Sequence, residues 1–172
     1  PKVLHRLAGK SMLEHVNNTR MTLGANQAKI FYGNGGDLLT QECQDFTVEW
    51  AWQKDQLVTA HAVQQASPNI NEDDIALILY GDVPLIKAKT LETLISRVTG
   101  NNISLLTVNL DEPAGYGRIV RKAEKVTAIV EHKDASEDIR EINEVNTGIL
   151  AIRAGYLKEW SPHGVELRVC HR

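Results

Sequence analysis

A glycine, an aspartate and a proline follow the most apolar stretch of the sequence. Residues 75–80 form a continuous apolar run of the kind that a parallel sheet buries on both faces, and Gly81, Asp82 and Pro84 come directly after it. In open α/β sheets, ligands bind beyond the carboxyl ends of the strands. A glycine lets the backbone approach a ligand closely, and a carboxylate suits a hard cation such as Mg²⁺. Asp82 is therefore a candidate metal ligand, or alternatively it only caps the turn before Pro84.

Two amides and a hydroxyl group precede a predicted helix at residues 59–66. The side chains of Gln53, Gln56 and Thr59 can read the edge of a nucleobase, and the helix N-terminus can hold a phosphate. The alternative is a polar loop in which Thr59 is the N-cap. Lys2 is a lone cation beside a proline, and it is either a solvated surface lysine or a point charge that neutralises a phosphate.

Polar residues also follow a predicted hairpin and open the last predicted strand. Glu131 comes directly after the hairpin, where it either accepts hydrogen bonds from sugar hydroxyl groups or is a surface charge. Asn146 and Thr147 offer an amide and a hydroxyl group at the start of the last strand. The alternative for this pair is a turn that merely initiates the strand.

These residues are positioned by strand-like and helix-like stretches that alternate along the chain. Strands separated by helices of about ten residues imply βαβ units and an α/β fold with a mostly parallel open sheet. Trp50 and Trp52 fall on one face of a predicted strand, which favours core positions over a platform on which bases stack. Strands are expected at residues 28–32, 47–52, 75–80, 103–110, 118–120, 126–130 and 147–152. Helices are expected at residues 11–23, 37–43, 59–66, 90–98 and 156–160.

The composition excludes several classes of protein. A chain of 172 residues with 42% hydrophobic and 24% charged residues is typical of one globular domain. Its net charge of −3 gives no broad electrostatic reason to bind nucleic acid or an anionic membrane. The two cysteines, Cys43 and Cys170, exclude a disulfide framework and a cysteine-rich zinc site, and they fit the reducing cytoplasm. The longest apolar run is too short to span a bilayer.

Six segments in one order resemble a known family. The sequence is similar, over residues 1–160, to the uridyltransferase domain of the bacterial bifunctional N-acetylglucosamine-1-phosphate uridyltransferase / glucosamine-1-phosphate acetyltransferase. This resemblance implies a Rossmann-like, GT-A-like nucleotidyltransferase fold with a mixed, mostly parallel open sheet flanked by helices. The segments that carry it are Pro1–Leu4, Gln53–Ala62, Leu79–Leu85, Gly115–Ile119, Ile129–Ala135 and Glu144–Gly148.

The resemblance also implies a reaction and a set of site residues. The family joins UTP to N-acetylglucosamine 1-phosphate, giving UDP-N-acetylglucosamine and pyrophosphate, with Mg²⁺ as cofactor. Such an in-line transfer needs aligned and neutralised phosphates rather than a protein nucleophile. By this resemblance, the catalytic residues are Lys2, which contacts phosphate, and Asp82, which binds Mg²⁺. The nucleotide is contacted by Gln53, Gln56, Thr59, Tyr80 and Gly81, and the sugar by Gly117, Glu131, Asn146 and Thr147.

The chain departs from the family at both ends and at one internal position. The family's glycine-rich signature, Leu-Ala-Ala-Gly-x-Gly-Thr-Arg-Met, would precede Pro1, and residues 161–172 no longer resemble the family. A partial domain at residues 1–160 is therefore expected, without the β-helical acetyltransferase domain and without its trimer. Val58 stands where the family has a glycine in the uracil loop, and a β-branched residue does not easily adopt a positive φ. These departures predict weakened activity.

Two other interpretations stay open at this point. One is a non-catalytic remnant that binds a nucleotide sugar weakly. The other is a GT-A-type glycosyltransferase, because such folds also place an aspartate and a metal at a strand end. Glycosyltransferases usually carry Asp-x-Asp, whereas Gly81-Asp82-Val83 supplies one aspartate.

Overall fold

A computed structural model describes residues 1–25, 27–33, 36–52 and 71–159 of the chain. Gln53, Gln56, Val58 and Thr59 lie outside the described residues, as do the predicted helix at 59–66 and the segment 161–172. The roles that the sequence assigns to these residues therefore stay predictions.

The chain begins with a short helical turn, a small hairpin and the first long helix. The first helix begins where the sequence predicts it, because the Ser11 hydroxyl accepts a hydrogen bond of 3.1 Å from the amide N–H of Glu14. It ends before Gly24, whose φ of +71° is easily adopted by a glycine. These elements are the 3-10 helix η1 (Lys2–Leu4), β1 (Arg6–Leu7), β2 (Lys10–Ser11) and α1 (Met12–Thr22).

Two parallel strands form a separate small sheet. They are β3 (Lys29–Tyr32) and β4 (Glu49–Trp52), joined through α2 (Gly36–Glu42), and their register places Tyr32 beside Trp52. Trp50 is confirmed as a packing residue, since it lies edge-on to Tyr32 at 6.1 Å between ring centroids. The prediction that Trp52 is a core residue is wrong, because its side chain is 58% exposed. Trp52 is the last residue of β4, and it is not among the residues that pack on the buried cluster of Leu13, Leu39 and Cys43, although its register partner Tyr32 is.

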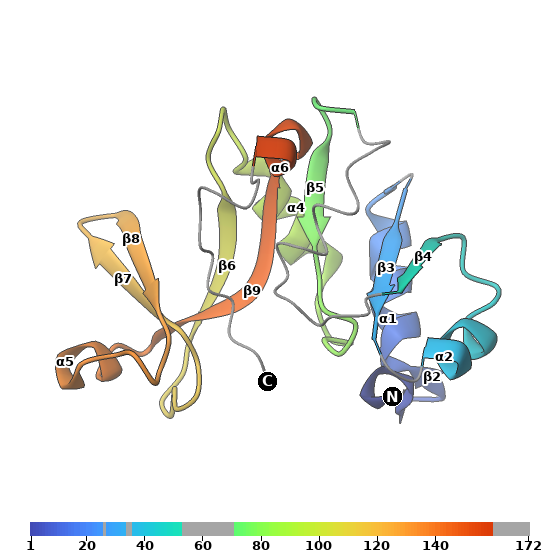
Figure 1. The fold of residues 1–172 in the computed structure, drawn as a ribbon, viewed down its shortest axis with the longest axis horizontal. Coiled ribbons are helices and arrows are strands. Elements are labelled where there is room, and N and C mark those ends of the chain that lie inside the picture. The colour runs from blue at the N-terminus through green and yellow to red at the C-terminus, as the bar shows by residue number, and fades with distance from the viewer. Residues whose placement is uncertain (26, 34–35, 53–70, 160–172) are drawn as a thin grey trace.

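A larger sheet of five strands is organised around the last strand. This strand, β9, pairs on antiparallel ladders with β5, β6 and β7, and β8 lies at the edge beyond β7 (Figure 1). The five strands are β5 (Ile75–Ile78), β6 (Ser104–Asn109), β7 (Arg118–Lys122), β8 (Lys125–Val130) and β9 (Glu144–Arg153).

The expected βαβ unit is present, but another strand separates its two strands. β5 and β6 run in the same direction and are connected through α4 (Ala88–Ser96), yet β9 lies between them and runs the opposite way. The α/β class and the mixed sheet flanked by helices are thus confirmed. Parallel pairs are fewer among the described strands than the sequence predicts. The reason is that β9 is apolar and buried from Ile149 to Ile152, which suits it to the centre of the sheet.

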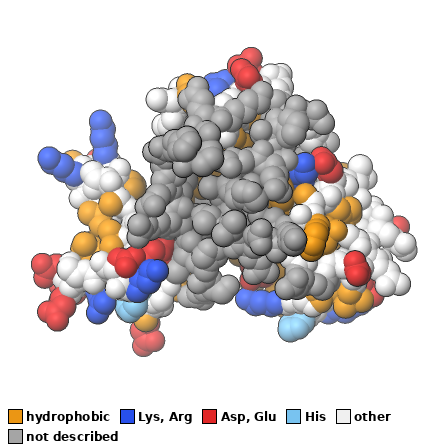
Figure 2. Space-filling view, viewed as in Figure 1, with side chains coloured by type: hydrophobic (Ala, Val, Ile, Leu, Met, Phe, Trp, Pro, Cys, Tyr) orange, Lys and Arg blue, Asp and Glu red, His pale blue; other side chains and the backbone are white. Residues whose placement is uncertain are grey.

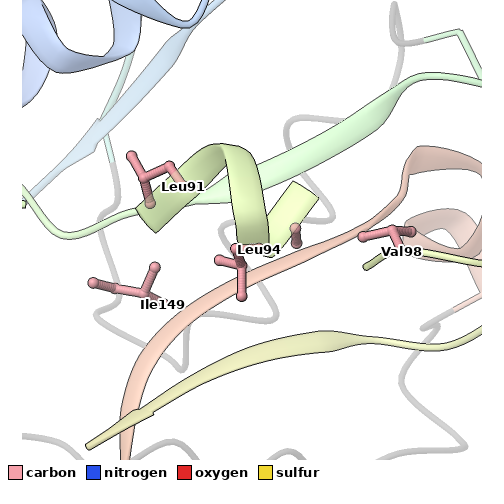
Figure 3. Packing of buried hydrophobic residues seen from close by; sticks show 5 residues of the cluster. Leu91, Leu94, Val98 and Ile149 are labelled. Atoms are coloured by element: carbon pink, nitrogen blue, oxygen red, sulfur yellow. The ribbon is translucent and has the colours of Figure 1, made fainter. Parts of the chain in front are cut away.

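The core between α4 and β9 holds the site in place. Leu91 and Leu94 share one face of α4, Val98 follows the helix, and all three pack in one cluster with Ile149 and Ala151 of β9 (Figure 3). Burial of each such leucine or isoleucine contributes about 1.5–3 kcal/mol. Partly buried side chains of the loop after β5 pack on the same cluster, so this core fixes β9 and that loop relative to each other. They are Tyr80, Val83 and Ile86.

Two further helices complete the described chain, α5 (Glu137–Arg140) and α6 (Ala154–Glu159). None of the helices within the described ranges combines the length and the apolar character that a membrane span requires.

Candidate functional site

The loop that follows β5 brings two predicted site residues together. The ammonium group of Lys2 lies 2.9 Å from a carboxylate oxygen of Asp82, although the two residues are 80 positions apart in the chain. Lys2 is exposed and Asp82 is partly exposed, so water screens the pair and it contributes little to stability. Both groups are instead available to a ligand at this edge of the sheet.

Gly81 explains how the N-terminal segment reaches this loop. A Cβ on Gly81 would lie 3.1 Å from a methyl group of Leu13 and 3.3 Å from one of Val3. The absence of a side chain at Gly81 therefore lets η1 and α1 pack directly on the loop. This packing places Lys2 beside Asp82.

Three residues that the resemblance assigns to the sugar also lie together. A Cβ on Gly117 would lie 3.3 Å from the Oε1 atom of Glu131, so the Glu131 carboxyl group rests against the backbone of Gly117. The carbonyl oxygen of Gly117 accepts a hydrogen bond of 2.8 Å from the amide N–H of Asn146. Gly117, Glu131 and Asn146 therefore form one group, where β7, β8 and β9 meet.

The Glu131 carboxyl group is buried and has unused hydrogen-bonding capacity. Its side chain belongs to a residue that is 6% exposed, and within the described part of the chain neither oxygen has a hydrogen-bond partner. The alternative of a surface charge at Glu131 is therefore wrong. A buried polar group without a partner costs free energy, so a ligand that reached this carboxyl group and donated hydrogen bonds to it would gain affinity.

The Asn146 side chain has a fixed orientation. Its Oδ1 atom lies 2.9 Å from the backbone N–H of Gly148, and a backbone N–H can only donate, so this atom is the amide oxygen. Within the described residues the Nδ2 group has no partner and is left to donate to a ligand. Thr147 is engaged differently, since its hydroxyl donates to the Leu106 carbonyl at 2.6 Å and accepts from Ile149 N at 3.2 Å.

Tyr80 links the loop after β5 to Gly148 of β9. Its ring lies over Gly148, where a Cβ would come 2.5 Å from the Tyr80 hydroxyl oxygen, and Gly148 has a φ of +75°. Gly148 thus accommodates Tyr80 and at the same time binds the Asn146 side chain. The sequence signal for Gly148 is its place in the Asn-Thr-Gly triplet, but the sequence analysis assigned Gly148 no role of its own.

Arg118 is a second residue that sequence reasoning missed. It is 1% exposed, and its guanidinium group donates to the carbonyl oxygens of Pro113 at 2.6 Å and Arg140 at 3.3 Å. A third contact, at 3.4 Å, reaches Nδ1 of His132, the residue after Glu131. Arg118 therefore holds the loop before β7 and the end of α5 around Glu131. Its only sequence signal was its place in the Gly-Tyr-Gly-Arg segment.

Asp82 suits a magnesium site to which the protein contributes a single carboxylate. In the described part of the chain no three histidine, cysteine, aspartate or glutamate residues are grouped as metal ligands. Mg²⁺ usually keeps several waters and is bound by one or two carboxylates together with substrate phosphates, so a single exposed carboxylate suits it. Asp82 already has a cationic neighbour, since the Lys2 ammonium group lies 2.9 Å from its carboxylate.

Several solved structures have the same fold. A CMP-2-keto-3-deoxy-manno-octonic acid synthetase complexed with CTP superposes with a TM-score of 0.71 at 18% identity, over 96% of this chain and 73% of that one. HddC from Yersinia pseudotuberculosis gives a TM-score of 0.68 at 16% identity, over 95% and 71% of the two chains. A putative glucose-1-phosphate thymidylyltransferase from Bacillus anthracis gives 0.65 at 16% identity, over 97% and 68%.

A family model decides the relationship. The model of the MobA-like NTP transferase domain matches residues 1–144, a range that contains Lys2, Asp82, Gly117 and Glu131. The match covers most of the chain, and the structural neighbours share its mixed sheet and flanking helices. The chain therefore belongs to the MobA-like NTP transferase domain family and has a Rossmann-like nucleotidyltransferase fold.

Proposed function

We propose that the chain transfers a uridylyl group from UTP to N-acetylglucosamine 1-phosphate, releasing pyrophosphate. Membership of an NTP transferase family supports nucleotidyl transfer. The choice of UTP and of this sugar phosphate rests on the resemblance of six sequence segments. The observation that carries the proposal is that Tyr80, two residues before Asp82 of the Lys2–Asp82 pair, lies over Gly148, whose backbone N–H binds the Asn146 side chain.

The Lys2–Asp82 pair suits the phosphates of the substrates. In the reaction, a phosphate oxygen of the sugar phosphate forms a bond to the α-phosphorus of UTP, and the bond from that phosphorus to the β-phosphate oxygen breaks. The attacking oxygen is already ionised, so no protein base is needed. Lys2 neutralises phosphate charge as this transfer proceeds. Asp82 would hold Mg²⁺, which supplies further charge neutralisation at the phosphates when bound.

The group of Gly117, Glu131 and Asn146 suits a hexosamine. The Glu131 carboxyl group accepts hydrogen bonds, and the Nδ2 group of Asn146 donates them, so together they match the hydroxyl and acetamido groups of the sugar. Gly117 has no side chain to obstruct the Glu131 carboxyl group. Arg118 keeps the surrounding loops in place, which orients the sugar for transfer.

A panel of substrates tests the proposal. Pyrophosphate release would be measured for the full chain with Mg²⁺ and with each pair drawn from UTP, CTP, TTP and GTP and from the 1-phosphates of N-acetylglucosamine, glucose and mannose. We expect the highest kcat/KM for UTP with N-acetylglucosamine 1-phosphate. A higher kcat/KM for another pair, or no release with any pair by a folded chain, would contradict the proposal.

A further inference from the structure

Trp52 places a large aromatic surface in solvent at the end of a parallel strand pair. It is the last residue of β4, its side chain is 58% exposed, and its register partner is Tyr32, the last residue of β3. Within the described ranges Trp52 has no aromatic partner, unlike Trp50, which packs edge-on against Tyr32. An exposed indole offers a large, flat apolar face on which a ligand can pack.

Trp52 lies at the same edge of the molecule as Lys2 and Asp82, the residues assigned to the phosphates. Tyr32 and Trp50 pack on a cluster that contains Leu13 and contacts Val3, and both Leu13 and Val3 approach Gly81. Figure 1 shows the N-terminus and the loop after β5 at the end of the molecule toward which β3 and β4 run. Carboxyl ends of parallel strands are where ligands bind in such sheets. An unbroken series of contacts therefore leads from Asp82 to Tyr32, the register neighbour of Trp52.

We infer that Trp52 is the platform on which the nucleobase of the bound nucleotide stacks. This inference rests on the proposed nucleotidyl transfer and names the residue that holds the base. The indole face is apolar and flat, and it stacks on any base, since every base has a π-face. The charged Lys2 and Asp82 then lie at the phosphate end of the same nucleotide.

The space-filling view agrees with a mixed surface at this part of the molecule. Hydrophobic side chains and charged side chains lie next to one another over the described residues at the right of Figure 2. A nucleotide likewise combines an apolar base face with anionic phosphates. An apolar partner, by contrast, would gain nothing from the Lys2–Asp82 pair.

Binding measurements with and without the base test the inference. The affinity of the full chain would be measured calorimetrically for UTP and for inorganic tripolyphosphate, which has no base. Trp52→Leu removes the π-surface, and we expect it to weaken UTP binding about tenfold. Trp52→Phe, which keeps a stacking face, should retain most of the affinity. Tripolyphosphate should bind equally to all three chains.

A control and a second readout distinguish stacking from general damage. Met21→Ala removes another exposed apolar side chain, from α1, and should leave both affinities unchanged. In a Trp160→Phe background, UTP but not tripolyphosphate should quench the fluorescence, and Trp52→Phe should abolish that quenching. Equal UTP affinity in Trp52→Leu, or an equal loss for tripolyphosphate, would overturn the inference. If UTP binding depends on Trp52 while no sugar nucleotide forms, the inference holds and the proposed reaction fails.

Discussion

The carboxyl group of Glu131 lies so close to the backbone of Gly117 that a Cβ at position 117 would be 3.3 Å from Oε1. The same Cβ would be 3.1 Å from a methyl group of Ile129, so it is confined on two sides. Gly117→Ala should therefore displace the Glu131 carboxyl group by a few tenths of an ångström. We expect about a fivefold loss of affinity for N-acetylglucosamine 1-phosphate, of the order of one hydrogen bond. Calorimetry with UTP as the second ligand checks this, and an equal loss for UTP would contradict it.

The buried Glu131 carboxyl group should lower the stability of the fold while it supports binding of the sugar phosphate. Its two buried oxygens have no partner in the described part of the chain, so the folded state bears a desolvation cost that ligand binding offsets. Glu131→Gln removes the charge at nearly constant volume, and we expect it to raise the free energy of unfolding by about 1 kcal/mol. The same variant should bind the sugar phosphate more weakly. Urea unfolding and calorimetry measure the two effects, and a variant that loses both stability and affinity would show that Glu131 is a structural residue.

Gly148 should tolerate no side chain. Gly148→Ala combines a φ of +75° with a clash against the Tyr80 ring, so we expect a loss of about 2–4 kcal/mol in the free energy of unfolding. Gly24→Ala is the matched control, because Gly24 has a φ of +71° but no atom within 4 Å of its Cβ position. The control should lose only about 1 kcal/mol. Similar losses for the two variants would show that Tyr80 moves away without cost.

Glu144 should make stability depend on pH. Its carboxylate accepts hydrogen bonds from Arg121 at 2.6 and 2.7 Å and from Thr107 at 2.7 Å, which fastens β9 to β7 and β6. Chiefly through the Arg121 hydrogen bonds, this network lowers the pKa of Glu144. A lowered pKa means that the stabilisation is complete above the ordinary value of about 4.3 and is lost as the pH falls through the folded-state pKa.

The test of this network compares wild type with Glu144→Gln across pH. The variant should lose about 1 kcal/mol in the free energy of unfolding at pH 7, and the difference should shrink as the pH falls below about 4. Glu92→Gln serves as the control, since Glu92 makes a longer contact of 3.5 Å with Lys89 on an exposed face. A difference for Glu144→Gln that stays constant with pH would refute the assignment.

Local signals in the sequence predicted the elements well. The Ser11 cap and Gly24 delimit α1, and the apolar spacing of Leu91 and Leu94 predicts the buried face of α4. The order of strands was not predictable, because periodicity reports which face of a strand is buried and not which strand lies beside it. The insertion of β9 between β5 and β6 is decided by long-range pairing.

The sequence predicted which residues belong to the site better than it predicted what surrounds them. Asp82 and Lys2 were both named from the sequence, and their contact of 2.9 Å follows from the packing of η1 on Gly81. Burial of Glu131 was not visible, since a glutamate after a strand has the same local pattern whether or not other strands cover it. Trp52 shows the converse, because alternation along β4 puts it on the same face as Trp50 but does not reveal that Trp50 packs on the buried cluster and Trp52 does not.

The most direct measurement is of product formation by the full chain. UTP, N-acetylglucosamine 1-phosphate and Mg²⁺ would be incubated with wild type, Asp82→Ala and Glu131→Ala, and UDP-N-acetylglucosamine would be quantified by mass spectrometry. The account predicts product with wild type. It predicts loss of the Mg²⁺-dependent rate in Asp82→Ala, and in Glu131→Ala a raised KM for the sugar phosphate with the KM for UTP little changed. Absence of product from a folded wild-type chain, or equal rates for wild type and Asp82→Ala, would contradict the account.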